Sequence, residues 1–496
     1  MKRAVSAGKP KQGKRICGAF CLCAAAAATL SAQTFTSLYS FDGTDGADPT
    51  AGLVQATDGN LYGAAGGGGA DRGGTIFKIT TAGALTTLYN FCSLTDCADG
   101  ESPYTGPVQA TNGNFYGTTL SGGAYKSGTV YEVTQGGTQT TLYSFCAKFE
   151  CADGTAPSGL VQGTNGAFYG TTPNSGDNNG YNESGTVFKI TASGKLTTLH
   201  VFCTDAPTCT DGYQPQAGLV QGTNGDFYGT TSAGGAHGGG TVFKITPGGT
   251  LATLYNFCSV GGTECEDGME PYAPLIQGTD GNFYGTTLAG GNGNGTVFKI
   301  TPAGILTTLY LFCSVNTDGV CTDGESPYAG LVLGSDGNFY GTTRYGGAHK
   351  SGTVFRFTPN VGLATLYSFC SEGGSLCTDG QYPNAGLVQA TNGSFYGATD
   401  LGGAYGVGTI FSLSVGLGPF VETQPTSGKA GAAVTILGTD LMGATSVTFD
   451  GAEAALETVS SSAITTTVPA GAHSGKVRVV TPGGTLSSNL PFRVKP

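Results

Sequence analysis

Tryptophan is absent from this chain of 496 residues, and methionine occurs three times. Charged residues make up 11% of the sequence, against a usual share of about 25%. A high glycine content, here 87 residues, is also typical of disordered chains. However, aromatic residues reach 10% and the sequence repeats itself regularly, so we predict an ordered fold. No stretch of the repeat spaces its apolar residues as a helix would, which argues against a helical fold class.

Histidine is scarce as well. A Ser-His-Asp triad needs one histidine that is held by one acid. The glycine-rich run 66–69 is not followed by Gly-Lys-Ser/Thr, so it is not a phosphate-binding loop. These absences favour a function other than catalysis. The four histidines are scattered over one predicted strand, two loops and the C-terminal segment: His200, His237, His349 and His473.

The first 32 residues have the pattern of a secretory signal peptide. Six lysines and arginines precede an apolar run at 16–30, and small residues follow as cleavage sites. That run is short for a membrane span, which needs about 20 residues; a retained N-terminal anchor is the alternative. Removing residues 1–32 takes away six positive charges and no acids, which lowers the formal net charge from −11 to −17. We expect no membrane span in the mature chain, and so acidic a chain should not bind nucleic acid.

A Tyr-Gly pair recurs seven times at intervals of 53 to 59 residues, together with the sequence around it. A fixed period of this size indicates a stack of similar supersecondary units. The seven tyrosines are Tyr62, Tyr116, Tyr169, Tyr228, Tyr284, Tyr340 and Tyr396.

Each unit contains four segments with the composition of β-strands. In the unit at 329–370, Asp336-Gly337 between the first two segments is a strong hairpin signal. Four antiparallel strands per unit, seven times over, predict an all-β fold, a seven-bladed β-propeller. In this unit the segments are 329–333, 339–343, 353–358 and 363–369.

The two ends of the repeat region are complementary. It opens with a segment of the fourth type at 36–41 and closes with one of the third type at 408–413. The N-terminal strand can therefore complete the last unit and cover an edge that would otherwise be exposed. We predict a closed propeller over residues 33–417. The alternative, an open β-solenoid, would need capping ends, which the sequence does not show.

Twelve of the fifteen cysteines lie in the repeats, as six local pairs at the same point of successive units. An even count, a fixed place and an export signal favour disulfides. Metal binding is the weaker alternative, because two cysteines without a histidine supply half of a zinc site. The pairs are Cys92/Cys97, Cys146/Cys151, Cys203/Cys209, Cys258/Cys265, Cys313/Cys321 and Cys370/Cys377.

The period stops after Leu417, and residues 418–496 differ in composition. About 80 residues of short strand-like segments separated by turns predict a small immunoglobulin-like β-sandwich. Its clearest segments are 433–437, 446–449, 463–468 and 475–480.

Both parts resemble known families. The unit Gly-Leu-Val-Gln-x-Thr-Asp/Asn-Gly-x-Phe-Tyr-Gly-Thr-Thr, followed by Gly-Thr-Val-Phe-Lys-Ile, resembles the GloVer tandem repeat over about residues 35–415. This resemblance implies a bacterial protein that is exported and displayed at the surface, and it implies no activity. The C-terminal segment, with Val447-Thr-Phe-Asp-Gly451, resembles an IPT/TIG domain. Such a domain implies a spacer or a binding accessory.

An Asp-Gly pair recurs once per unit, on the face where the variable loops are expected. The seven carboxylates could bind calcium, the one cofactor that we consider, or sugar hydroxyl groups. The favoured interpretation is structural, an Asx turn in which glycine permits a positive φ. The seven residues are Asp45, Asp99, Asp153, Asp211, Asp267, Asp323 and Asp379.

Loops that vary between copies are the usual place for binding residues on a rigid scaffold. Here the loops between second and third strands carry aromatic side chains and a rare cation, which could contact sugar rings or pack on neighbouring loops. These residues are Tyr125, His237, His349, Tyr405 and Arg344. Glutamines that recur in the first strands are expected to form hydrogen bonds between units, and Leu333 is the exception.

Nearly every feature of the chain is repeated, whereas catalysis needs a singular site. We therefore expect an exported, non-catalytic binding or scaffold protein of the cell surface, a monomer whose loop face meets an extracellular polysaccharide or a surface protein. A secreted carbohydrate-active enzyme is the first alternative, because Glu101, Glu270 and Glu325 follow Asp-Gly turns and paired carboxylates hydrolyse glycosides. A purely structural envelope protein is the second.

Overall fold

The computed structural model describes residues 33–174, 184–260, 265–374 and 376–495, so the predicted signal peptide lies outside the described residues. The described chain is all-β, apart from two 3-10 helices of three residues each, η1 (Thr95–Cys97) and η2 (Phe149–Cys151). This agrees with the predicted fold class.

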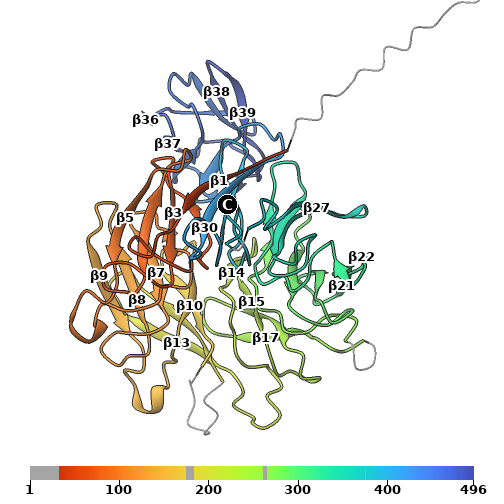
Figure 1. Cartoon of the computed structure of the whole chain (residues 1–496). Coiled ribbons are helices and arrows are strands. Elements are labelled where there is room, and N and C mark those ends of the chain that lie inside the picture. Colours follow the sequence, from red (N-terminus) through yellow and green to blue (C-terminus); the bar gives the residue numbers. More distant parts are fainter. Residues whose placement is uncertain (1–32, 175–183, 261–264, 375, 496) are drawn as a thin grey trace, which may run out of the picture.

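The repeat region forms seven four-stranded antiparallel sheets, which we number 1 to 7 (Figure 1). Strands pair in chain order from first to fourth. The first strands of sheets 1 to 7 are β2 (Val54–Gln55), β6 (Val108–Gln109), β10 (Ser158–Gln162), β14 (Val220–Gln221), β18 (Ile276–Gln277), β24 (Val332–Leu333) and β28 (Val388–Gln389). The second strands are β3 (Leu61–Ala65), β7 (Phe115–Thr119), β11 (Phe168–Thr172), β15 (Phe227–Thr231), β19 (Phe283–Thr287), β25 (Phe339–Thr343) and β29 (Phe395–Thr399).

Sheet 7 joins the two ends of the repeat region, because its fourth strand is β1 and its other three strands come from the last unit. Thr34 of β1 pairs with Ser414 of β30. The third strands are β4 (Thr75–Ile79), β8 (Thr129–Val133), β12 (Thr186–Ile190), β16 (Thr241–Ile245), β20 (Thr296–Ile300), β26 (Thr353–Thr358) and β30 (Thr409–Ser414). The fourth strands are β5 (Leu85–Asn90), β9 (Gln139–Ser144), β13 (Leu196–Val201), β17 (Leu251–Asn256), β21 (Leu306–Leu311), β27 (Gly362–Ser368) and β1 (Thr34–Ser40).

Glutamine side chains link neighbouring sheets. The Gln109 carboxamide oxygen accepts from the Thr57 amide at 3.0 Å, and the same bond recurs at six of the seven junctions. One of the six joins sheet 7 to sheet 1, where the Thr391 amide donates to Gln55 at 2.8 Å. The exception is the junction between sheets 5 and 6, where Leu333 stands in place of glutamine. These bonds fit the role expected from the sequence.

The first strands are two residues long in six sheets, shorter than the five-residue segments that composition predicts. The residues just before them leave the backbone pairing with their own second strand and approach the neighbouring sheet. A Cβ atom at Gly106 would lie 2.2 Å from the Gly52 carbonyl oxygen. The backbones of adjacent sheets therefore approach too closely there for any side chain, which explains the glycine.

Aromatic stacking explains the recurring Tyr-Gly pair. Each of these tyrosines lies against the first residue of the next sheet's second strand. The Tyr62 and Phe115 rings are stacked with centroids 4.0 Å apart, and five further pairs repeat this contact. At the seventh junction, Tyr396 belongs to the same buried cluster as Leu61. The core of the repeat region therefore lies between sheets, as well as within them.

The C-terminal segment forms a β-sandwich around one apolar core. One sheet consists of β31 (Glu422–Gln424), β33 (Ala433–Leu437), β37 (Ala463–Thr467) and β36 (Thr458–Val459). The other consists of β35 (Ala452–Ala454), β34 (Ser446–Phe449), β38 (Val477–Thr481) and β39 (Gly484–Ser487). A short parallel pair, β32 (Ser427–Gly428) and β40 (Arg493–Val494), completes the domain.

This C-terminal domain is docked on the side of the sheets that carries the short first-to-second turns (Figure 1). Ser462 donates to the Thr57 carbonyl oxygen at 2.8 Å, and the hydroxyls of Thr439 and Thr391 lie 2.8 Å apart. Leu490 packs against the apolar cluster that contains Leu333. The one interruption in the glutamine series therefore lies in the cluster that receives the C-terminal domain.

Candidate functional site

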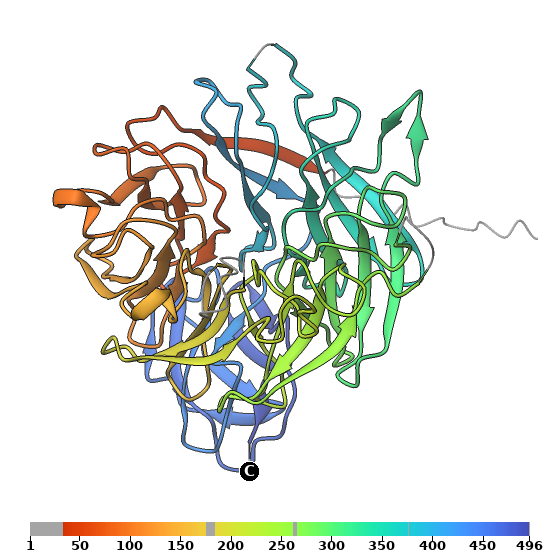
Figure 2. The ribbon, with the colours of Figure 1, turned by 90° about the horizontal axis from the view of Figure 1, so that it is seen from below.

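The face opposite the C-terminal domain carries the second-to-third loops and the segments that connect successive sheets; we call it the loop face (Figure 2). Its disulfides all lie in the connecting segments. The six bonds join Cys92 to Cys97, Cys146 to Cys151, Cys203 to Cys209, Cys258 to Cys265, Cys313 to Cys321 and Cys370 to Cys377.

Each connecting segment is also fastened by the aspartate of its Asp-Gly pair. The Asp99 carboxylate is fully buried and accepts from the Tyr89 hydroxyl at 2.8 Å and the Ser93 amide at 3.0 Å. Burial and this carboxylate raise the pKa of Tyr89 to about 12. The same tyrosine-to-aspartate bond joins Tyr39 to Asp45, Tyr143 to Asp153, Tyr255 to Asp267, Tyr310 to Asp323 and Tyr367 to Asp379.

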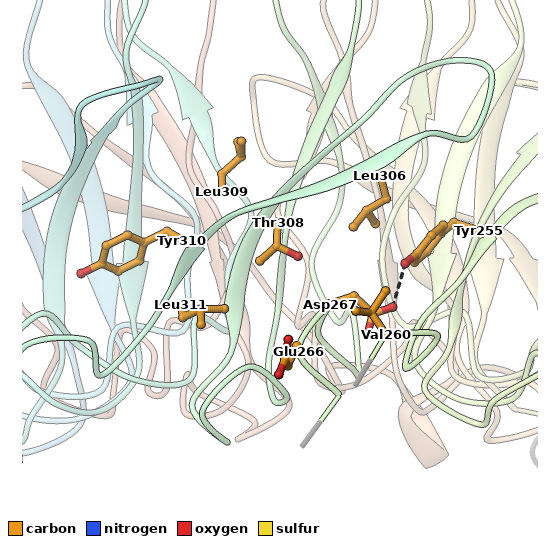
Figure 3. A pocket seen from close by; sticks show the side chains of 9 residues that line it. All are labelled: Tyr255, Val260, Glu266, Asp267, Leu306, Thr308, Leu309, Tyr310 and Leu311. Atoms are coloured by element: carbon orange, nitrogen blue, oxygen red, sulfur yellow. Dashed lines mark hydrogen bonds between the residues drawn. The ribbon is translucent and has the colours of Figure 1, made fainter. Parts of the chain in front are cut away.

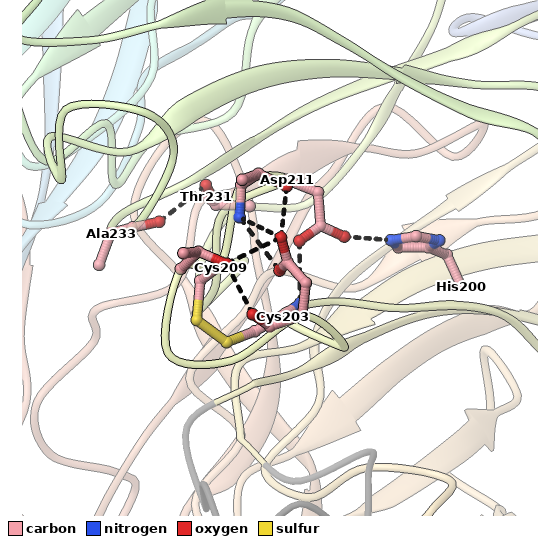
Figure 4. Close-up of a disulfide and its surroundings, with 9 residues drawn as sticks. His200, Cys203, Cys209, Asp211, Thr231 and Ala233 are labelled. Carbon is pink, nitrogen blue, oxygen red and sulfur yellow. Dashed lines mark hydrogen bonds and ion pairs between the residues drawn. A yellow bond between two sulfur atoms is a disulfide. The ribbon is translucent and has the colours of Figure 1, made fainter.

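Sheet 3 differs, because His200 replaces the tyrosine. Its Nε2 atom lies 2.8 Å from Asp211 Oδ2, and the second oxygen of Asp211 accepts from the Cys203 amide at 2.9 Å (Figure 4). The structure thus places all seven predicted aspartates in internal hydrogen bonds. In the described residues no group of three or more His, Cys, Asp or Glu side chains is placed to hold a metal ion.

The predicted aromatic residues of the second-to-third loops lie apart from one another, on sheets 2, 4, 6 and 7. Each is exposed at the tip of its loop, and the tip is bonded to the end of the fourth strand of its own sheet. The Ala124 amide donates to Ser144, and the Ala236 amide to Asn256. The structure does not gather them into one site: Tyr125, His237, His349 and Tyr405.

Arg344 lies elsewhere, at the point where the second strand of sheet 6 ends. Its guanidinium group is 4.0 Å from the Asp400 carboxylate and lies over the rings of Tyr328 and Tyr345, each at 5.4 Å. Asn384 donates through Nδ2 to the same oxygen of Asp400 at 3.0 Å. We call Arg344, Asp400, Asn384, Tyr328 and Tyr345 the Arg344 cluster.

Sheet 1 adds a second carboxylate beside this cluster. Burial raises the pKa of Asp48, and burial together with the charge of Asp48 raises the pKa of Asp400, against the opposing effect of Arg344. Two like charges close together disfavour double ionisation. Tyr104, from the next connecting segment, has 42% of its surface exposed, and burial and both carboxylates raise its pKa.

Backbone bonds hold this region in place. Arg344 and Asp400 each donate their amide to the residue before a proline, Ser326 and Tyr382 respectively. Ser326, Tyr382 and Asp48 have φ values of 53°, 57° and 54°. The residue before the proline has the same left-handed conformation in the other four units, at Ser102, Ala156, Gln214 and Glu270, so this conformation belongs to the repeat and does not distinguish the cluster.

The Arg344 cluster is where the repeat loses its symmetry. The residue that follows the second strand is Gly66, Leu120, Pro173, Ser232 and Leu288 in sheets 1 to 5, and it is Arg344 and Asp400 in sheets 6 and 7. Two charged side chains thus replace uncharged ones in adjacent sheets. Of these two, the sequence singled out Arg344 alone.

Three polar atoms in and beside the cluster are buried without a hydrogen-bond partner among the described residues: Arg344 Nε, Asn384 Oδ1 and Thr50 Oγ1. Thr50 and Asn384 occupy the same position, after the proline, in sheets 1 and 7. Leaving such a group unsatisfied costs about 1–3 kcal/mol. A ligand or water that bonded to these atoms would recover that energy.

Sequence reasoning missed the other residues of the site: Asp400, Asn384, Asp48, Thr50, Tyr104, Tyr328 and Tyr345. A signal was present, because aligning the copies at the residue after the second strand isolates Arg344 and Asp400 at once. What the alignment could not give is that Asp48 of sheet 1 lies beside sheet 7, where its amide donates to the Val407 carbonyl oxygen at 3.1 Å and its charge acts on Asp400.

A hollow elsewhere in the structure lies between the fourth strands of sheets 4 and 5 (Figure 3). It has a volume of about 560 Å³ and is lined by Tyr255, Asp267 and Leu306, among others. A similar hollow of about 510 Å³ lies between sheets 2 and 3, beside His200 and Lys148. Both open on the circumference, and neither shares a residue with the Arg344 cluster.

The Gloeobacter/Verrucomicrobia repeat matches residues 93–266, 206–411 and 316–444, which together exceed half of the chain. The chain belongs to this repeat family. The IPT/TIG domain matches residues 421–494. Both resemblances noted in the sequence are therefore confirmed. A comparison with curated proteins found no match.

Two solved structures share the fold. One is the extracellular domain assigned to a hybrid two-component system of B. thetaiotaomicron, with a TM-score of 0.50 and 12% identity over 83% of this chain. The chain spans 46% of that relative's length. The other is a fungal alcohol oxidase of the AA5 family in complex with copper, with a TM-score of 0.50 and 13% identity over 93% of this chain and 99% of that one. Because these sequence identities are low, the two likenesses show a shared fold and indicate nothing about function.

Proposed function

We propose that this chain is an exported, non-catalytic binding protein of the bacterial cell surface, and that its loop face binds an extracellular polysaccharide. Residues 1–32 would be its signal peptide, residues 33–417 a closed seven-bladed β-propeller, and residues 418–496 an IPT/TIG domain that covers the opposite face. The protein would act as a monomer.

Export is supported by the six disulfides, which form and persist outside the cytoplasm. One structural relative is an extracellular domain. Among the described residues, no helix has the length and apolar character that crossing a bilayer would require. Closure of the propeller is supported by the pairing of β1 with β30 and by the bond from Thr391 to Gln55.

The observation that carries the binding role is the Arg344 cluster, the place on a repetitive loop face where charged, aromatic and unsatisfied polar groups converge. The tip residues Tyr125, His237, His349 and Tyr405 would be outer contacts for a long polymer. We propose that calcium is not required, because the seven Asp-Gly carboxylates already accept hydrogen bonds from the chain itself.

Retention of the mature chain, residues 33–496, on immobilised polysaccharides in calcium and in EDTA tests this proposal. We expect retention on one class of polymer in both solutions. Arg344→Leu should weaken it, since leucine occupies this position in sheets 2 and 5 and should fold there. Arg72→Ala, another loop-face arginine, is the matched control. Retention that is equal in R344L and the original would overturn the site, and binding to a surface protein with no glycan retained would overturn the polysaccharide.

One observation favours a second candidate function, a carbohydrate-active enzyme. Asp48 and Asp400 are neighbouring carboxylates with raised pKa values, and glycoside hydrolysis uses a carboxylate pair of which one is protonated. Release of reducing ends from the retained polymer, abolished in both D48N and D400N, would establish this function. Retention without release would support the binding protein.

A further inference from the structure

We infer that the Arg344 cluster is a subsite for one uncharged, hydroxyl-rich ring, a neutral hexose unit of the polymer. This inference rests on the proposed polysaccharide-binding function and specifies which sugars the site accepts. It would be held by Arg344, Asn384 and Thr50, with Tyr104 at the side.

The unsatisfied atoms define the complementary chemistry. Arg344 Nε–H can donate a hydrogen bond and cannot accept one. Asn384 must present its Nδ2 to Asp400, since a carboxylate accepts hydrogen bonds, so its buried Oδ1 is left as an acceptor. Thr50 Oγ1 can do either. A sugar hydroxyl both accepts and donates, so the hydroxyls of one ring match the donor of Arg344, the acceptor of Asn384 and the hydroxyl of Thr50.

Charge argues against an acidic ligand. The single positive charge of Arg344 is already paired with Asp400, at 4.0 Å, and is covered by the rings of Tyr328 and Tyr345. Asp48 adds a second acid nearby. A uronate or phosphate group would meet two carboxylates and one occupied guanidinium, whereas a neutral hydroxyl meets no net repulsion. An ammonium group has no lone pair, so the amino group of a cationic amino sugar cannot take the place of the hydroxyl that accepts from Arg344 Nε–H.

Tyr104 supplies an apolar surface. Its ring is 42% exposed, and a Cβ at Gly66 would lie 3.0 Å from ring atom Cε2, so the glycine makes room for the ring. Gly66 also donates its amide to the Asp48 carbonyl oxygen at 3.0 Å, so the ring of Tyr104 lies beside the segment that carries Asp48. Tyrosine is the largest aromatic residue that this chain can offer to a sugar, because tryptophan is absent.

The test is saturation-transfer NMR on the mature chain with methyl glycosides of glucose, galactose and mannose, the matching uronates, and glucosamine. We expect transfer to at least one neutral glycoside and at least tenfold weaker binding of its uronate and of glucosamine. Arg344→Lys keeps the charge and removes the Nε–H, and Asn384→Ser introduces the residue found at position 158. Each should weaken the neutral glycoside by about tenfold or more, the factor for one well-made hydrogen bond. Thermal unfolding of both variants verifies that they fold.

The outcomes separate the two proposals. Absence of transfer to every neutral glycoside, or unchanged affinity in both R344K and N384S, overturns the subsite even if a polymer is retained on the column. Uronate or glucosamine binding as tight as the neutral sugar also overturns it. Transfer to a neutral glycoside that both variants weaken, without retention on any polymer, supports the subsite and overturns the polysaccharide-binding function.

Discussion

His200 Nε2 lies 2.8 Å from Asp211 Oδ2, in the position where six other units set a tyrosine hydroxyl against an aspartate. The His200 ring also meets Phe202 edge-on, with centroids 4.8 Å apart, as Tyr89 meets Phe91. The bond to the aspartate, and not the identity of its donor, is therefore the common feature of the loop face.

We predict that His200→Tyr is tolerated, because a tyrosine hydroxyl donates to the equivalent aspartate in sheets 2 and 4. The unfolding free energy should change by less than about 1 kcal/mol. His200→Ala should lower it by about 1–3 kcal/mol, since the partly buried Asp211 loses a donor. Urea unfolding measures both, with the exposed His237→Ala as control. An alanine variant as stable as the original would show that the bond contributes nothing.

The disulfide between Cys92 and Cys97 should contribute as well, although it closes a short loop with a sequence separation of 5. The chain-entropy relation gives about 2 kcal/mol for a loop of this size. Replacing both cysteines by serine should lower the unfolding free energy by that amount, measured in urea. A cost near zero would mean that Asp99 alone organises the segment.

The glutamine hydrogen bond between sheets 7 and 1 should contribute as much to the unfolding free energy as the equivalent bonds between the other sheets. Gln55→Ala removes the acceptor for the Thr391 amide, and Thr391 is fully buried. The expected loss is about 1–3 kcal/mol in the unfolding free energy. Gln109→Ala, which cuts an internal link to Thr57, is the matched control. If Gln55→Ala left the unfolding free energy unchanged while Gln109→Ala lowered it, the repeat region would be an open array.

Glu422 gives the C-terminal domain a dependence on pH. Burial raises its pKa from 4.5 to about 7, against the bond that it accepts from Asn489 at 3.0 Å. The folded protein therefore holds a proton that the unfolded chain has released above pH 4.5, so stability is greatest below that pH and falls as the pH rises to about 7. The total loss is at most about 3 kcal/mol.

Glu422→Gln should abolish this loss and make the protein more stable than the original at pH 8. Urea unfolding at pH 5 and pH 8 measures the difference between the two proteins. The exposed Glu453→Gln in the same domain should leave the pH dependence unchanged. Equal pH profiles for E422Q and the original would show that Glu422 ionises normally.

Much of the fold could be predicted because it depends on local patterns. The second-strand segment 339–343 and the tail segments 433–437 and 446–449 match β25, β33 and β34 residue for residue. The first strands could not be predicted in length. Their early residues meet a neighbouring sheet at Gly52 and Gly106, and this contact joins residues that are far apart in sequence.

The candidate site was less accessible to sequence reasoning. Arg344 stood out as a rare cation, but its partner Asp400 was one acid among many, and Asp48 comes from the other end of the repeat region. Burial of both carboxylates and the effect of the Asp48 charge on Asp400, which distinguish these residues, are properties of packing. The repetition that made the fold easy to predict also obscured the few positions where the copies differ.

The pairing of β1 with β30 sets an order on assembly. β1 precedes the other strands of the repeat region, and its partner β30 lies in the last unit, so β1 cannot pair until nearly the whole repeat region has been made. A chain interrupted before residue 409 would present two unsatisfied strand edges, which invite pairing with other chains. The repeat region can therefore reach its native state only after β30 has been made. A chain truncated before that point keeps both strand edges exposed.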